Sequence, residues 1–145
     1  MGLLSRIAGM ATGTKKAEDD ELLLHAMLLM AGADGSIDEE EIAAVRAFAW
    51  TLPELKDADF GRVLAGAQKL ARRYSTPQES VAALAELSTP ALKLKAFVLV
   101  VDIALASGDI DEAEDTMLET MQRLLGVDDQ SAQTIIGVLS MKYAK

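Results

Sequence analysis

The chain carries two copies of one acidic pattern, ADGSIDEEE at residues 33–41 and ASGDIDEAE at residues 106–114. The two central glycines, Gly35 and Gly108, lie 73 positions apart, which is half of the 145-residue chain. The likeness continues beyond the pattern at the pairs Val45/Leu118, Phe48/Met121 and Leu52/Leu125. This spacing predicts an internal duplication, in which each half has an apolar helix, a tight turn at glycine and a second helix that begins with carboxylates.

The composition favours helices throughout. Half of the residues are hydrophobic, only 4% are aromatic and only 3 are proline, and the length matches one domain. Apolar residues recur at helical spacing, and cap residues mark several helix starts, two of them followed by a proline. The predicted helices cover about 18–32, 38–51, 60–74, 76–87, 90–106, 111–125 and a last segment from 128. We therefore predict a single compact all-α domain of seven to eight helices over 17–145, built from two similar halves with repeats around 20–53 and 92–126.

The charge and the apolar segments limit the classes of partner. A net charge of −9 repels nucleic acid and anionic membrane surfaces, so we expect no nucleic-acid partner. The apolar runs at 22–33 and 96–106 are too short to cross a bilayer, which predicts no direct membrane insertion. Residues 1–16 form an amphipathic segment without a secretory signal, expected to dock or fray, and we expect a cytoplasmic protein.

The carboxylates of the two acidic turns have a structural interpretation. Asp38 and Asp111 stand at helix N-cap positions, and Glu41 and Glu114 follow three residues later, as in a capping box. Acidic side chains in a first helical turn also interact favourably with the helix dipole. This interpretation explains these four residues without any ligand.

The same turns hold more negative charge than two caps require, which favours a cation site. If the duplication brings the turns together, their oxygens would form a cluster that a divalent cation stabilises. With one histidine and no cysteine, the donors suit Ca²⁺, Mg²⁺ or Mn²⁺. An EF-hand is not matched, because Met30 and Gly32 stand where its first oxygen ligands are needed. The candidate metal ligands are therefore shared between the turns: Asp34, Asp38, Glu41, Asp109, Asp111 and Glu114.

Two further polar residues lie in apolar helices. A lone buried carboxylate is costly, so Asp102 either points outward, meets Lys93, Lys95 or a helix-terminal N–H, or points toward the acidic cluster as an additional or supporting ligand. His25 is expected to form an interhelical hydrogen bond or to lie at the surface.

The two motifs, with the Ala-x-x-Phe that follows the first and the MQRLLGVDD that follows the second, resemble the tellurite-resistance TerB-like family over about 20–140. The resemblance implies a compact helical domain with acidic residues that handle a divalent cation. It also implies a non-enzymatic role in stress or tellurite resistance through protein partners, some of them membrane-associated. The second copy departs from the family's Asp-Gly, because Ser107 precedes Gly108 and the charge follows as Asp109.

The leading functional hypothesis is a cation-responsive, non-enzymatic module that recruits a protein partner. The alternative is a metal-free interaction or scaffold domain, in which the acidic turns are only helix caps and the acidic surface binds a basic partner or forms a homodimer. An enzyme is disfavoured, because the chain has no phosphate loop, nucleophile elbow or H-E-x-x-H motif.

Overall fold

The computed structural model of the protein describes residues 17–35 and 37–145. The predicted amphipathic segment 1–16 lies outside this part of the chain. Over the described residues the protein is all-helical, as predicted. The helices are α2 (Asp19–Ala31), α3 (Glu39–Ala49), α4 (Phe60–Ala71), α5 (Pro77–Ser80), the 3₁₀ helix η1 (Val81–Glu86), α6 (Pro90–Ala106), α7 (Glu112–Leu124) and α8 (Asp129–Lys142).

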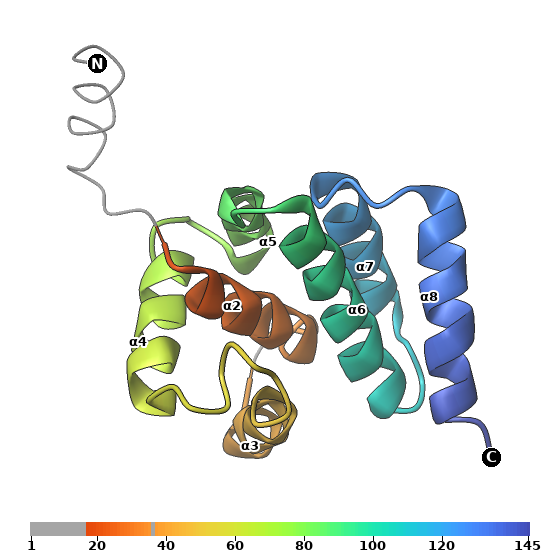
Figure 1. The fold of residues 1–145 in the computed structure, drawn as a ribbon, viewed down its shortest axis with the longest axis horizontal. Helices are drawn as coiled ribbons and strands as arrows, with labels where there is room; N and C mark the ends of the chain where they lie inside the picture. The colour runs from red at the N-terminus through yellow and green to blue at the C-terminus, as the bar shows by residue number, and fades with distance from the viewer. Residues whose placement is uncertain (1–16, 36) are drawn as a thin grey trace, which may run out of the picture.

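The order of the helices repeats once along the chain. Helices α2, α3 and α4 are followed, after α5 and η1, by α6, α7 and α8, and α4 packs on α2 as α8 packs on α6 (Figure 1). Helices α3 and α7 begin 73 positions apart, at Glu39 and Glu112. The arrangement of helices therefore follows the duplication that the sequence pattern predicts.

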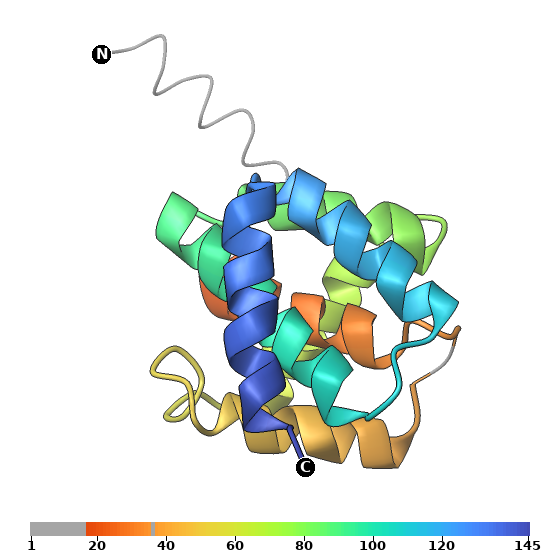
Figure 2. The same ribbon diagram turned by 90° about the vertical axis from the view of Figure 1, so that its right-hand side faces the viewer.

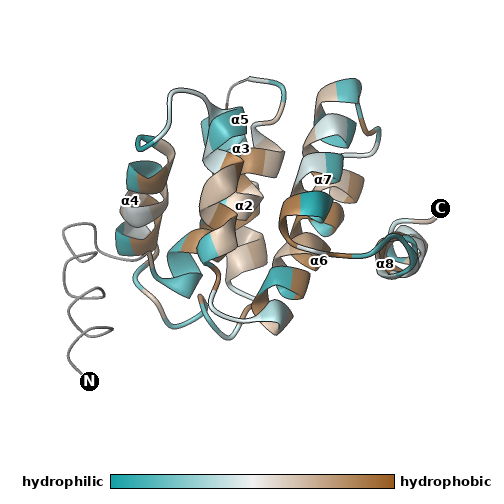
Figure 3. Ribbon diagram, turned by 90° about the horizontal axis from the view of Figure 1, so that it is seen from above, coloured by the Kyte–Doolittle hydropathy of each residue, from teal (hydrophilic) through white to brown (hydrophobic). Residues whose placement is uncertain are grey.

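Helices α2 and α6 form the centre of the molecule. Leu22, Leu23 and Met27 of α2 and Val100 of α6 have no solvent-exposed surface. Both helices are apolar on most sides, as expected of helices that are covered by others (Figure 3). They pack against each other, and α3, α4 and η1 contact α2, while α7 and α8 contact α6.

The ends of the helices follow the cap residues in the sequence. Thr76 and Thr89 accept hydrogen bonds from the backbone N–H of Glu79 and Leu92, and a proline follows each threonine at the first helical position. Gly126 ends α7 with a φ of 70°, a value that glycine adopts readily.

The continuous helix predicted over 76–87 is wrong in its second part. The α-helix ends after one turn at Ser80, and the chain continues as the 3₁₀ helix η1 to Glu86. The hydroxyl of Ser80 donates to the carbonyl of Pro77 at 2.6 Å, which is a local bond that competes with a regular helix. Within the described residues, no helix is both long and apolar enough to cross a membrane.

Candidate binding pockets at the two acidic turns

The two acidic turns have the same local geometry. Gly35 has a φ of 116° and Gly108 a φ of 98°, in the region that favours glycine. After the first turn, Asp38 Oδ1 accepts from the N–H of Glu41 at 2.8 Å, and Glu41 Oε1 accepts from the N–H of Asp38 at 3.0 Å.

The second turn repeats this reciprocal pair. Asp111 Oδ1 accepts from the N–H of Glu114 at 2.8 Å, and Glu114 Oε1 accepts from the N–H of Asp111 at 3.2 Å. Both capping boxes predicted from the sequence are therefore present.

The second turn meets the start of α3. A pocket of about 190 Å³ lies between α3, the end of α6 and the start of α7, and both Glu41 and Glu114 line it. Figure 2 shows the end of α6 beside α3. Apart from the two carboxylates and Ser107, the lining is apolar: Ala31, Ala44, Val45, Phe48, Ile103 and Ala106. We call this cavity the paired-glutamate pocket.

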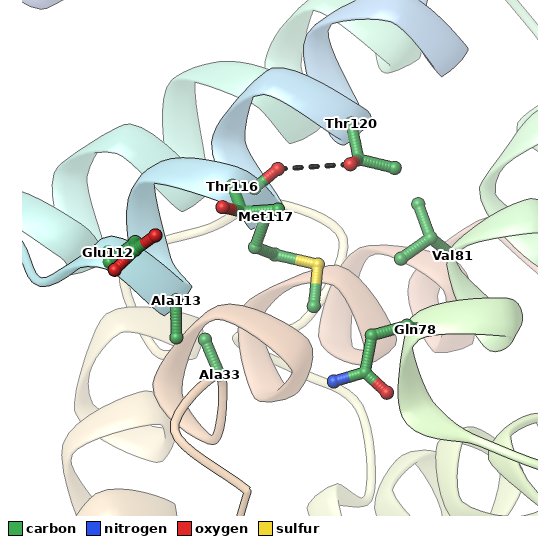
Figure 4. A pocket seen from close by; sticks show the side chains of 8 residues that line it. All are labelled: Ala33, Gln78, Val81, Glu112, Ala113, Thr116, Met117 and Thr120. Carbon is green, nitrogen blue, oxygen red and sulfur yellow. Dashed lines mark hydrogen bonds between the residues drawn. The ribbon is translucent and has the colours of Figure 1, made fainter.

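The first turn meets the start of α7 in the same way. Ala33, which corresponds to Ala106 in the second half, lies close to Ala113 in a second pocket of about 470 Å³ (Figure 4). Met117 and Val81 form apolar walls of this pocket, and Glu112, Gln78, Thr116 and Thr120 line it with polar groups. Each turn therefore lies against the first turns of the helix from the other half.

The predicted ligands are only partly brought together. Glu41 and Glu114 share one pocket, and their neighbours Asp38 and Asp111 lie at the helix starts as exposed caps. Asp34 and Asp109 are exposed and do not line the paired-glutamate pocket. In the described part of the chain, no three histidine, aspartate or glutamate side chains gather closely enough to hold a metal ion. The cation site thus stays a prediction.

Asp102 has its partners at the C-terminal end of α8, and not in Lys93 or Lys95 of its own helix. Its carboxylate accepts hydrogen bonds from Lys142 Nζ at 3.0 and 3.2 Å and from the hydroxyl of Tyr143. The hydrogen bond that Lys142 donates to Asp102 raises the pKa of Lys142, while burial and the same carboxylate raise the pKa of Tyr143. Asp102 therefore forms an ion pair with Lys142, and these contacts connect the end of α8 to α6.

His25 links α2 to α5. Its side chain is buried, and Nε2 lies 3.0 Å from the carbonyl oxygen of Ser80, to which it donates. Burial lowers the pKa of His25, and the bond to Ser80 offsets part of this effect. This is the interhelical role expected for the residue.

Two features of the site were not anticipated from the sequence. The residues that form the apolar walls of the paired-glutamate pocket have the helical spacing of ordinary core residues, so the sequence does not mark them as a site. Nothing in the sequence around Lys142 and Tyr143 indicates that they bind Asp102. The lone carboxylate in an apolar helix was the one available signal, since it required a partner from somewhere in the fold.

The comparison with protein families identifies the class of protein. The model of the family described as Tellurite resistance protein TerB matches residues 16–135, and the chain belongs to this family. Comparisons with curated proteins and with solved structures gave no match. The family assignment agrees with the all-helical fold and supports a module of the tellurite-resistance type.

Proposed function

We propose that this TerB-family chain is a non-enzymatic cytoplasmic module of tellurite resistance that binds a protein partner through the paired-glutamate pocket. The observation that carries the proposal is the position of Glu41 and Glu114 on one pocket with otherwise mainly apolar walls. In each capping box the backbone bond engages Oε1, so Oε2 of each glutamate is not used by the cap. Oε2 of Glu114 accepts one long hydrogen bond, at 3.4 Å, from the hydroxyl of Ser107.

The lining of this pocket suits a basic side chain. Lysine and arginine combine an apolar stem with a cationic head, so the stem would contact Ala44 and Phe48 while the head lies at the carboxylates. The net charge of −9 would also attract a basic partner from a distance. Binding through this pocket should therefore weaken as salt is raised.

A divalent cation between Glu41 and Glu114 is the second candidate. It is favoured by the same shared pocket, which joins one carboxylate from each half. Two carboxylates are fewer than a Ca²⁺ cage requires, whereas Mg²⁺ keeps several waters and is commonly held by one or two carboxylates. Of the three ions considered, Mg²⁺ suits this donor set best, and Asp102 would not contribute, because Lys142 and Tyr143 engage it.

The test uses variants that keep the helix caps. Glutamine serves at the third position of a capping box as glutamate does, so Glu41→Gln with Glu114→Gln removes the pocket charge and retains the cap. The matched control is Glu40→Gln with Asp115→Asn, which removes two exposed charges from the first turns of the same helices.

Survival in tellurite of cells that depend on this chain is the readout. The pocket variant should lose resistance while its unfolding temperature stays near that of the control, and the control should remain resistant. Equal resistance of the two variants would reject the pocket as the functional contact.

Thermal unfolding with Mg²⁺ or with EDTA separates the two candidates. If Mg²⁺ binds the pocket, an excess of about a hundredfold over Kd stabilises the wild type by about 2.7 kcal/mol and leaves the pocket variant unchanged. If the unfolding temperature of the wild type is the same in Mg²⁺ and in EDTA, the pocket does not bind Mg²⁺, and the proposal of a basic protein partner stands alone.

A further inference from the structure

Between its first residue, Asp129, and its last, Lys142, helix α8 has no charged side chain. From Gln130 to Met141 the sequence has no acidic or basic side chain, although charged residues form 26% of the chain. Eight residues of this stretch are exposed: Gln130, Gln133, Thr134, Ile136, Gly137, Val138, Ser140 and Met141. We call them the outer face of α8.

The outer face is apolar at its centre and has an open position. Val138 is 56% exposed and Met141 is 71% exposed. A side chain placed at Gly137 would have no other atom within 4 Å, so the helix has a notch beside Val138. Ile136, Val138 and Met141 are three of the seven large hydrophobic residues exposed in the described chain, and all three lie on one helix at the edge of the molecule (Figure 1). Exposed apolar residues that gather in this way mark interaction sites.

The distribution of charge decides which partner fits. Residues 107–128, which include the second acidic turn and α7, have seven acidic side chains and one basic. Residues 129–145 have one acidic side chain, Asp129, and two basic ones, Lys142 and Lys145. Two copies of the chain can therefore meet along α8 without bringing their acidic segments into contact, whereas contacts through α3 or α7 would meet strong repulsion.

We propose that the outer face of α8 binds the same face of a second copy, in an antiparallel pair about a twofold axis. An axis beside residues 137 and 138 sets Val138 of each copy over the notch at Gly137 of the other, and sets Met141 over Thr134. The antiparallel arrangement also places the helix dipoles in favourable opposition.

The size of the helix sets the strength of this contact. A helix of 14 residues is about 21 Å long, so it offers much less than the roughly 800 Å² per partner of a stable interface. We therefore expect a weak dimer in equilibrium with the monomer. This inference does not depend on the paired-glutamate pocket, which lies on other residues.

Sedimentation equilibrium of the full chain over a range of concentrations tests the proposal. The variants Val138→Glu and Val138→Lys place like charges beside the twofold axis, so each alone should separate the copies. The control Ala47→Glu adds the same charge at an exposed position of α3. A thermal unfolding curve for each variant checks that the fold is kept.

The mass of the wild type and of Ala47→Glu should rise toward two chains as the concentration increases. Val138→Glu and Val138→Lys should each stay at the mass of one chain, and an equimolar mixture of the two should regain association. A wild type that remains monomeric up to about 1 mM, or a Val138→Glu variant that associates like the wild type, would overturn the proposal. Association of the wild type that persists in both single variants would place the dimer contact elsewhere.

Discussion

Glu41 and Glu114 line one pocket although they lie 73 positions apart in the sequence. Each belongs to a capping box at the start of a helix, and the two helices occupy equivalent places in the two halves of the fold. The duplication therefore has a chemical consequence, because it brings one carboxylate from each half to the same cavity.

Loss of an N-cap should destabilise either half by a similar amount. Asp38→Ala and Asp111→Ala each remove the acceptor for a backbone N–H at the start of a helix, at a cost of about 1 kcal/mol. Serine is also a good N-cap, so Asp38→Ser and Asp111→Ser should cost less than the alanine variants. Urea unfolding measures both series, and equal losses for alanine and serine would show that charge rather than capping matters.

Alanine should have opposite effects at two kinds of glycine. At Gly35 or Gly108 the positive φ strains any side chain, so Gly→Ala should cost about 1–3 kcal/mol. At Gly137, inside α8 with open space around it, Gly→Ala should stabilise by about 0.5–1 kcal/mol. Thermal unfolding in dilute solution compares the three variants. A loss of stability on Gly137→Ala, or unchanged stability on both Gly35→Ala and Gly108→Ala, would contradict these predictions.

The bond between Tyr143 and Asp102 should contribute to stability. Tyr143→Phe removes a donor to a carboxylate whose side chain is only 13% exposed, and the expected loss is about 1.5 kcal/mol. Tyr74→Phe is the matched control, since its hydroxyl has no hydrogen-bond partner in residues 17–35 and 37–145. If both variants unfold at the same denaturant concentration, Asp102 does not depend on Tyr143.

The stability of the fold should fall in mild acid because of His25. Its pKa is lowered in the native state, so the unfolded chain takes up a proton first as the pH falls below about 6.5. The free energy of unfolding should then decrease by at most about 1.4 kcal/mol per pH unit from this residue, until the native pKa is reached.

The variant His25→Gln isolates this contribution, because the carboxylates titrate in both proteins. Glutamine can still donate to the carbonyl of Ser80, and it has no proton to gain. Denaturant unfolding between pH 7.5 and about 5 should show a shallower decline for the variant. If the free energy of unfolding falls equally with pH in the two proteins, the pKa of His25 is not lowered in the native state.

Local sequence signals predicted the helices and their ends well, whereas contacts between distant segments were harder to predict. The caps at Asp38 and Asp111 follow from residues three positions apart, so they need no knowledge of the fold. The irregular segment after Ser80 was missed, because the run of valine, alanine and leucine that follows suits an α-helix as well as a 3₁₀ helix.

The candidate site shows the same limit. The repeat predicted that the two turns belong to equivalent halves, but only the position of α3 beside the end of α6 decides that Glu41 and Glu114, and not Asp34 and Asp109, line one pocket. The pairing of Asp102 with Lys142 likewise depends on how α8 lies along α6.

The central claim is that the turn of one half lies against the helix start of the other. The chain has no cysteine, so Ala44→Cys in the lining of the paired-glutamate pocket gives a single site for a nitroxide spin label. Paramagnetic broadening of the backbone amide signals then reports which segments lie near the label. The account predicts strong broadening at Ser107 and Glu114, far away in sequence, and not only within α3. Broadening confined to α3 and its chain neighbours, with sharp signals at Ser107 and Glu114, would contradict the shared pocket and the function proposed from it.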